Sequence, residues 1–375
     1  MGATRTRHRF HAICPYFAMF PEAFAERWIN QLTRPGDLIL DPFSGRGTTV
    51  FQANLMGRRG LACDINPVAF VLSKAKTNAP TLKGTLARVD ELEEEFINLG
   101  LEAHEWESAT DGSLEFFEMA YAPKTLQQLI FLRVNLRPAK SDEDCMICAV
   151  ALGALHGETV RSNNYLSNQM PRTISTKPSY SVKYWRARNM RAPTRNVFSV
   201  LRDRLEFRYG SQPPSVKSSV FLADMRELPR VARSYRRKAH LVVTSPPYLD
   251  TTSFEEDQWL RLWLLGGPPK PARGRISPDD RRSGARAYWS FIGDMWRTIG
   301  LMTSDNGHVV IRVAGKDMSG DNLVAGLEGT SVLTQRPIRL INSESSPLVR
   351  RQTDALRPGS AGRQSEVDAY FQFVD

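Results

Sequence analysis

Short apolar runs of strand length recur along this chain, and helical patterns follow most of them. Residues 37–40 and 61–63 are such runs near the N-terminus, and 219–224, 241–243 and 307–315 are their counterparts in the C-terminal half. The segments that follow place apolar side chains every three to four positions, which is typical of helices packed on a sheet. This alternation predicts an α/β fold with a mostly parallel, doubly wound sheet.

Two more apolar runs, 338–341 and 369–374, complete the predicted sheet, and we expect the last one to be antiparallel. The strand pattern is absent from the middle of the chain, where helical patterns such as 145–155 dominate. The predicted boundaries are 1–80 and 216–375 for the sheet domain and 81–215 for a mainly helical insertion.

The chain of 375 residues is 41% hydrophobic and 24% charged, as expected of a globular protein with a full core, and its formal net charge is +10. Residues 161–208 contain eleven Lys or Arg and two acids, so this segment holds most of the surplus. Bases interleaved with aromatic and amide side chains suit contact with nucleic acid; the alternative is a solvated insertion without a partner. The predicted contact residues are Arg161, Arg172, Lys177, Lys183, Tyr184, Trp185, Arg186, Arg188 and Arg191, with Arg273 and Arg275 from a Pro- and Arg-rich stretch.

Four cysteines do not form a disulfide framework in a chain of this length, which indicates a reducing, cytoplasmic compartment. Cys145 and Cys148 have the spacing of a metal or redox pair, but no second pair follows and their segment has the pattern of a buried helix. We therefore expect no metal. No apolar run approaches the length of a membrane span, and no apolar signal region follows the N-terminus.

The stretch Asp41-Pro-Phe-Ser-Gly-Arg-Gly-Thr-Thr49 joins the first predicted strand to a helix. A Gly-rich turn at this place lets a ligand approach the backbone and lie on a helix N-terminus. The stretch lacks the third glycine of a dinucleotide fingerprint and the Gly-Lys-Ser/Thr of a phosphate-binding loop, so alone it is a weak signal. Asp64 ends the second strand about twenty residues after the glycines, where an acid can bind ribose hydroxyls; an ordinary turn residue is the alternative.

A second turn, Thr244-Ser-Pro-Pro-Tyr248, follows the strand at 241–243. Together with the Gly-rich turn it resembles the paired motifs of the DNA amino-methyltransferases that use S-adenosylmethionine. The resemblance covers most of 10–80 and 216–375, and it implies the class I methyltransferase fold, a Rossmann-like sheet with a final antiparallel strand. The chain departs from the family pattern in its large insertion between the second and third strands and in its lack of a long C-terminal recognition region.

The resemblance also implies that the strand ends hold S-adenosylmethionine. Asp41 would bind the ammonium of the methionine moiety, and Asp224 would accept from the adenine amino group, with Glu227 as a less favoured substitute. The implied cofactor-binding residues are Phe20, Pro21, Asp41, Phe43, Gly45, Gly47, Thr48, Thr49, Asp64, Asp224 and Met225. The first two would close over the methionine end, the glycines would leave room for the cofactor, and the two threonines could cap the following helix.

The amino group of a nucleobase is a poor nucleophile because its lone pair is delocalised into the ring. The Ser245 side chain and the Pro246 carbonyl can accept hydrogen bonds from the amino hydrogens and so favour a tetrahedral, nucleophilic nitrogen. Pro247 helps to stiffen the turn, and Tyr248 offers a face on which an extruded base can stack. Methyl transfer from a sulfonium is a direct displacement, so alignment and electrostatics would carry the catalysis.

Serine at the first catalytic position is commonest in family members that methylate N4 of cytosine, so we predict a site-specific DNA cytosine-N4 methyltransferase of restriction–modification type. The alternatives are adenine N6 as the target, an RNA or protein amino-methyltransferase, and a non-catalytic nucleic-acid-binding module. Carbon-5 methylation is set aside because none of the four cysteines follows a proline, as the nucleophile does in the resembled enzymes. The expected partner is duplex DNA with a base flipped out; the recognition sequence, a partner nuclease and the choice between monomer and homodimer stay open.

Overall fold

The computed structural model describes residues 7–16, 20–159, 162–168, 170, 177–249, 253–277, 284–315, 318–347 and 365–374. The chain divides into two compact units. The helical unit comprises Met1–Phe17, Lys74–Pro213 and Thr252–Ser277, and the sheet unit comprises Ala18–Ser73, Pro214–Thr251 and Pro278–Asp375. The expected insertion, 81–215, thus supplies most of the helical unit, which also includes an N-terminal segment and the segment that follows the Ser-Pro-Pro-Tyr turn.

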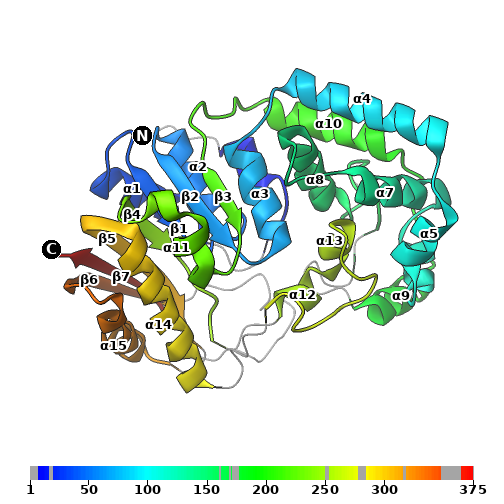
Figure 1. Ribbon diagram of the computed structural model, residues 1–375. Helices are drawn as coiled ribbons and strands as arrows, with labels where there is room; N and C mark the ends of the chain where they lie inside the picture. The colour runs from blue at the N-terminus through cyan, green and yellow to red at the C-terminus, as the bar shows by residue number, and fades with distance from the viewer. Residues whose placement is uncertain are drawn as a thin grey trace, which may run out of the picture. The chain divides into compact units, whose positions relative to one another are not determined.

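Within the described residues, seven strands form one sheet in the order β3-β2-β1-β4-β5-β7-β6 (Figure 1). The strands are β1 Leu38–Asp41, β2 Arg59–Asp64, β3 Ser219–Leu222, β4 Ala239–Thr244, β5 Thr303–Ala314, β6 Ile338–Pro347 and β7 Ser365–Phe373. Pairing is parallel from β3 through to β5, and β7 is antiparallel to both β5 and β6. The prediction of a mostly parallel sheet with an antiparallel final strand is confirmed.

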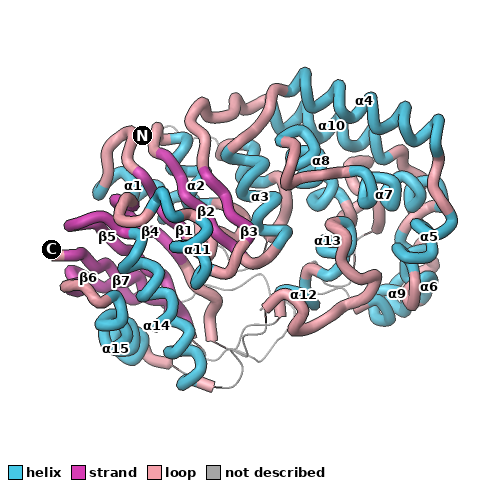
Figure 2. The backbone as a smooth tube through the Cα atoms, in the orientation of Figure 1, coloured by secondary structure: helices cyan, strands magenta, loops and turns pink. Residues whose placement is uncertain are grey.

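Helices cover both faces of this sheet. In β1, Leu38 and Leu40 pack in the cluster that contains α14, whereas Ile39 packs in the cluster that contains α1. One face carries α1 Glu22–Leu32 and α2 Thr48–Leu55, and the other carries α11 Leu228–Val231, α14 Ala285–Met302 and α15 Gly320–Ser331 (Figure 2). Burial on both faces is why the central strands β1, β2 and β4 are nearly continuous apolar runs in the sequence rather than alternating ones.

The helical unit is built from the middle of the chain and one later segment. Its helices are α4 Leu82–Leu99, α5 Ala103–Thr110, α6 Leu114–Ala120, α7 Pro123–Asn135, α8 Asp142–Ala154, α9 Pro178–Arg186, α10 Val197–Tyr209, α12 Phe254–Asp257 and α13 Trp259–Leu264. Helix α3, Pro67–Thr77, begins in the sheet unit and continues into the helical unit. The side chains of Thr81, Ser141 and Asn196 cap α4, α8 and α10, and each such cap contributes about 1 kcal/mol to helix stability.

Helix α8 is buried on all sides, as its apolar pattern predicts. Cys145 and Cys148 lie in its interior, and burial raises the pKa of Cys145 to about 12. A thiol with so high a pKa stays protonated and is a poor ligand or nucleophile. The prediction that the pair lies in a buried helix is confirmed. In the described part of the chain, no three His, Cys, Asp or Glu side chains gather closely enough to hold a metal ion.

No helix among the described residues combines the length and the apolar character that a membrane crossing requires.

Candidate active site

The Gly-rich turn and the Ser-Pro-Pro-Tyr turn lie side by side at one edge of the sheet unit. Strands β1 and β4 are parallel neighbours, with Leu40 opposite Val242, so both end at the same edge. Thr244, the last residue of β4, donates from Oγ1 to Oδ1 of Asp41 at 2.7 Å. A second bond joins the elements from the other direction, because Thr49 Oγ1 donates to the Val243 carbonyl at 3.2 Å. The two sequence motifs therefore form one site.

Asp41 is a buried carboxyl at the centre of this site, with only 1% of its surface exposed. Burial raises its pKa to about 6, although hydrogen bonds from Thr244, Thr49 and the Phe43 N–H act in the opposite direction. Asp64 adds repulsion that raises the pKa of Asp41 further. A carboxylate whose charge is incompletely compensated gains from a nearby cation, so this position fits the ammonium of a methionine moiety.

Both glycines of the Gly-rich turn adopt a backbone conformation that favours glycine. Both have a left-handed backbone, with φ of 49° at Gly45 and 74° at Gly47. A Cβ at Gly47 would lie 2.7 Å from Ser73 Oγ and 2.9 Å from Ser73 Cα, in α3. Close packing of α3 on the turn therefore requires Gly47, and the expectation that this glycine also leaves room for a cofactor stays a prediction.

The expectation that the two threonines cap α2 is wrong. Gly47 is the N-cap of that helix, with no side-chain capping bond, and the threonines are its first two helical residues. Thr49 instead ties α2 to β4, as described above. Thr48 Oγ1 accepts from Arg46 Nε at 3.2 Å. Arg46 is a buried residue that the sequence did not single out, and it forms an ion pair with Glu22 at 2.9 Å, linking the turn to the start of α1.

Asp64, at the end of β2, shapes the turn directly. Its Oδ2 accepts the Gly45 N–H at 2.8 Å, and its Oδ1 accepts the Asn66 N–H at 2.9 Å. A carboxylate oxygen has two lone pairs, so these backbone bonds are compatible with a further bond from a ribose hydroxyl. The ribose role stays a prediction, and to it the structure adds a role in holding the Gly-rich turn.

The third acid, Asp224, follows β3 and caps a short 3-10 helix, Met225–Glu227, by accepting from the Arg226 N–H at 2.9 Å. Glu227, the substitute considered from the sequence, is bound to Arg230 at 2.6 Å on the surface. After burial, the charges of Asp64, Asp224 and Asp41 raise the pKa of the Cys63 thiol, so all three acids act electrostatically on this residue of β2. Met225 is 3% exposed and belongs to the core, so its side chain is placed as a packing residue.

The predicted aromatic neighbours of the cofactor are also in the sheet unit. Phe43 is half-buried and its ring centroid lies 5.5 Å from that of Phe291 in α14. Phe20 makes an edge contact with Phe24 at 5.0 Å. Pro21 is exposed at the start of α1, where its carbonyl accepts from Phe24 N at 3.0 Å. Phe20 and Pro21 thus adjoin the helix that Arg46 connects to the Gly-rich turn.

The Ser-Pro-Pro-Tyr turn makes a contact that the sequence did not predict. Ser245 Oγ donates to the Tyr248 hydroxyl at 3.3 Å, and that hydroxyl donates to Glu366 Oε1 at 3.1 Å. Burial and the adjacent Glu366 raise the pKa of Tyr248. Arg312 of β5 forms an ion pair with Glu366 at 3.3 Å and a bidentate pair with Asp368, both bonds 2.6 Å. Strand β7 therefore contributes polar groups to a site that the motifs place on β1 and β4.

Some side chains of the basic segment, 161–208, are buried or ion-paired rather than exposed to solvent, contrary to the sequence-based expectation. Trp185 of α9 is fully buried and packs on Phe116, with ring centroids 5.6 Å apart. Its prediction as a nucleic-acid contact is therefore wrong, since its ring is part of the core of the unit. Arg186 forms an ion pair with Glu115. Two further predicted contacts, Arg161 and Arg172, lie outside the described residues.

Several predicted contacts do present charge to solvent. Within the described residues, Lys177, Lys183, Arg188 and Arg191 are exposed and form no ion pair, and the Arg188 guanidinium lies 3.9 Å above the Tyr184 ring. In the Pro- and Arg-rich stretch, Arg273 is bound to Glu256 at 2.5 Å. The Arg275 side chain is exposed, and its backbone N–H donates to Glu255 at 3.1 Å.

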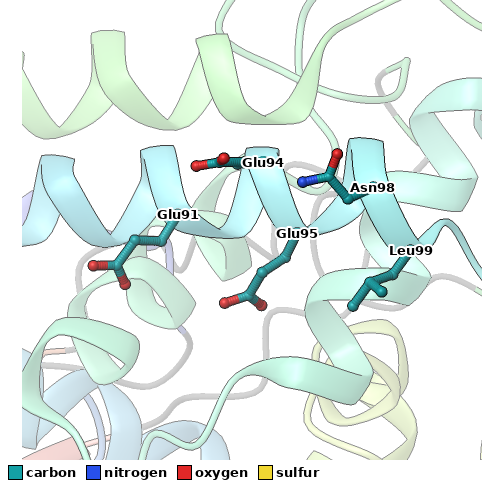
Figure 3. A pocket seen from close by; sticks show the side chains of 5 residues that line it. All are labelled: Glu91, Glu94, Glu95, Asn98 and Leu99. Atoms are coloured by element: carbon teal, nitrogen blue, oxygen red, sulfur yellow. The ribbon is translucent and has the colours of Figure 1, made fainter.

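Not every hollow in the molecule is a candidate active site. One lies on α4 of the helical unit (Figure 3). Its lining residues are Glu91, Glu94, Glu95, Asn98 and Leu99. Three carboxylates would repel a nucleic-acid phosphate, so this hollow is not suited to the substrate that the motifs imply.

Comparison with known proteins supports the resemblance over one part of the chain. Residues 4–75 match a family model described as DNA methylase. Type II methyltransferase M.MjaII of Methanocaldococcus jannaschii is 36% identical over 72 residues, which are 19% of this chain and 13% of that protein. M1.MboII of Moraxella bovis is 38% identical over 63 residues, 16% of this chain and 24% of that protein. M.BsoBI of Geobacillus stearothermophilus is 26% identical over 137 residues, 31% and 27% of the two chains.

The chain therefore spans less than a third of the length of these relatives. Among solved structures, the rRNA methyltransferase aviRa of Streptomyces viridochromogenes aligns over 95% of this chain and 87% of its own, with 13% identity and a TM-score of 0.34. The sheet order is established by the strand pairing alone. S-adenosylmethionine is the cofactor that the family match implies. Residues 4–75, with α1, the Gly-rich turn and β2, carry the sequence signature of the DNA amino-methyltransferase family.

Proposed function

We propose that this protein transfers a methyl group from S-adenosylmethionine to the exocyclic N4 of cytosine in DNA, on a base flipped out of the duplex. The observation that carries the proposal is the hydrogen bond from Thr244 to Asp41. It brings the turn suited to the cofactor and the turn suited to the target amino group to the same point. Similarity to type II methyltransferases supports a role in restriction–modification.

Three strand-end acids would bind the cofactor in order along the sheet edge. Asp41 would hold the ammonium, Asp64 the ribose hydroxyls and Asp224 the adenine amino group. Phe43 and the start of α1, with Phe20 and Pro21, would supply the apolar contacts. When bound, S-adenosylmethionine supplies an electrophilic methyl group on a sulfonium.

The catalytic turn would prepare the target nitrogen. Ser245 Oγ and the Pro246 carbonyl accept from the two amino hydrogens, which localises the nitrogen lone pair and aligns it for in-line displacement. The Tyr248 ring holds the base by stacking. Displacement would form the nitrogen–carbon bond as the carbon–sulfur bond breaks, the cofactor would leave as a neutral thioether, and the methylated nitrogen would lose one proton to water. Such a reaction requires no covalent enzyme intermediate.

DNA as the substrate is supported by the family match and by the exposed bases around α9. Cytosine as the base is supported by serine at position 245, through the family correlation. Adenine N6 is the second candidate, because the same turn can accept hydrogen bonds from either amino group.

The test offers labelled S-adenosylmethionine to the full chain with duplex DNA, RNA or protein, and digests the labelled DNA to nucleosides for mass spectrometry. We expect label in duplex DNA, carried by N4-methylcytosine. N6-methyladenine alone would overturn the choice of base, and label confined to RNA or protein would overturn the choice of substrate. Ser245→Ala is expected to lower the rate by at least about 100-fold; an unchanged rate would show that the catalytic turn is misassigned.

A further inference from the structure

A chain of hydrogen bonds leads from the catalytic serine to a carboxylate on β7. Ser245 Oγ lies 3.3 Å from the Tyr248 hydroxyl, which lies 3.1 Å from Glu366 Oε1. All three residues belong to the sheet unit. Neither motif contains Glu366, which follows the serine by more than a hundred positions along the chain.

We propose that Glu366 is a positioning residue that fixes the donor-to-acceptor direction of these hydrogen bonds. It thereby keeps the Ser245 oxygen available as an acceptor for the target amino group. The inference rests on the proposed function. A carboxylate only accepts hydrogen bonds, whereas a hydroxyl donates one and accepts others. With Glu366 at the end, Tyr248 must donate to it, and Ser245 can then donate to Tyr248.

The direction matters because a serine hydroxyl has a single proton. When that proton is directed to Tyr248, the lone pairs of Oγ face the amino hydrogens and assist the nucleophile. In the opposite direction, Ser245 would donate its proton toward the amino nitrogen and occupy the lone pair that attacks the methyl group. The same residue would then inhibit the reaction.

Arg312 holds Glu366 in the required position. Its guanidinium, which can only donate, lies 3.3 Å from Glu366 Oε2, the oxygen that Tyr248 does not use. It is itself fixed by the bidentate pair with Asp368 and by the Phe24 ring, 3.9 Å away. The antiparallel register of β5 and β7, with Arg312 opposite Asp368, builds this arrangement.

This geometry predicts an unusual result for a conservative substitution. In Glu366→Gln, the Arg312 guanidinium can only donate hydrogen bonds, so it binds the amide oxygen of the glutamine. The NH₂ group of the amide then faces Tyr248. The amide then donates to Tyr248, Tyr248 donates to Ser245, and Ser245 donates toward the target. The near-isosteric E366Q should therefore be worse than Glu366→Ala, which removes the acceptor without introducing a donor.

The experiment measures kcat and KM for E366Q, E366A, Y248F and the double variant E366Q/Y248F, using whichever acceptor the wild type methylates. We expect E366Q to lower kcat by about 100-fold and E366A by about 10-fold, with KM for S-adenosylmethionine little changed. In the Y248F background the series of hydrogen bonds between Glu366 and Ser245 is already interrupted, so adding E366Q should change kcat by less than about threefold. Melting temperature and cofactor affinity, measured on each variant, show whether the site is still folded.

Three results would overturn the inference while leaving the proposed function intact: E366Q with wild-type kcat, E366A at least as impaired as E366Q, or an equal E366Q effect with and without the Tyr248 hydroxyl. Failure of the wild type to methylate any acceptor is a different result. It would overturn the proposed function, and this inference with it.

Discussion

The Thr244 hydroxyl donates to the Asp41 carboxylate at 2.7 Å and thereby couples the ends of β4 and β1. One partner lies directly before Ser245, the proposed catalytic serine, and the other begins the Gly-rich turn. Because both are buried, the bond is shielded from water and is stronger than a surface contact. A displacement of one turn is therefore expected to displace the other.

The first prediction tests this coupling. Thr244→Val keeps the shape of the side chain but removes the donor, so the Asp41 charge loses one of its compensating bonds. A hydrogen bond to a charged group contributes about 1.5–3 kcal/mol, and we expect affinity for S-adenosylmethionine to fall by at least about tenfold, measured by calorimetry. Thr334→Val is the matched control, because its hydroxyl donates to the Arg336 carbonyl at 2.9 Å in the same unit. Equal affinity losses in both variants would mean that the loss reflects general destabilisation.

The second prediction concerns pH. Burial raises the pKa of Asp41 from 3.8 to about 6, so in the free protein this group takes up a proton as the pH falls through 6. An ammonium ligand favours the charged form. Affinity for S-adenosylmethionine should therefore rise with pH up to about 6 and level off above it, in a titration from pH 5 to 8. An affinity that is independent of pH in this range would show that the carboxylate does not bind the ammonium.

Asp41→Asn supplies the control for the same group. Since the folded-state pKa lies above the unfolded one, the charged carboxyl destabilises the fold, and this cost appears as the pH rises from about 4 to 6. The neutral amide removes it, so D41N should be more stable than the wild type at pH 8, by up to about 3 kcal/mol for a shift of roughly two units. It should equal the wild type near pH 4 and bind the cofactor weakly at every pH. Urea unfolding at the two pH values measures the difference.

The third prediction separates backbone strain from crowding at Gly47. Gly36 and Gly47 both have positive φ, of 90° and 74°, but a Cβ at Gly36 would meet nothing within 4 Å. Alanine at Gly36 therefore introduces only strain, about 1 kcal/mol. Alanine at Gly47 introduces strain and a collision with Ser73, and we expect it to cost about 1–3 kcal/mol more in denaturant unfolding. Equal costs would show that α3 moves away without penalty.

The sequence predicted the central strands well because β1, β2 and β4 are apolar runs that end at turns, and burial on both faces makes that signal strong. Strand β6 runs beyond the predicted 338–341 to Pro347, through exposed polar residues that carry no such pattern. The sequence did not predict α15, whose three glycines, Gly320, Gly326 and Gly329, weaken a helical pattern. The fold requires at least one of them, because a Cβ at Gly326 would lie 2.2 Å from the Trp289 ring of α14. Such a requirement arises from packing between helices and leaves no trace in local pattern.

In the candidate site, too, features that are local in the sequence were predicted, whereas contacts between distant residues were not. Asp41, Asp64 and Asp224 could be proposed as site residues because the first two end strands and the third closely follows one, and strand ends are local features. Glu366 was missed because its contact with Tyr248 depends on the register of β5 and β7, which pair residues distant in sequence. Trp185 was misplaced for a third reason. The basic segment was treated as one surface, whereas the period of α9 buries Trp185 and exposes Lys183.

The fourth prediction concerns the exposed bases of the helical unit. Lys183 and Arg188 are exposed and form no ion pair among the described residues, so charge reversal, K183E/R188E, should weaken duplex binding. The packing contact it removes is the surface contact of Arg188 with the Tyr184 ring. We expect affinity to fall at least about tenfold and the slope of log affinity against log salt to decrease by about two, one for each lost phosphate contact.

The matched control reverses two exposed lysines elsewhere in the same unit, Lys83 and Lys140, and makes the same change in net charge. Lys83 lies on α4, whose carboxylates already repel a phosphate backbone. K83E/K140E should therefore lower DNA affinity only slightly, through weaker long-range electrostatic attraction. Binding of S-adenosylmethionine should be unchanged in both double variants, because their substitutions lie outside the sheet unit. Equal losses of DNA affinity in the two variants would show that net charge, rather than a surface around α9, attracts the duplex.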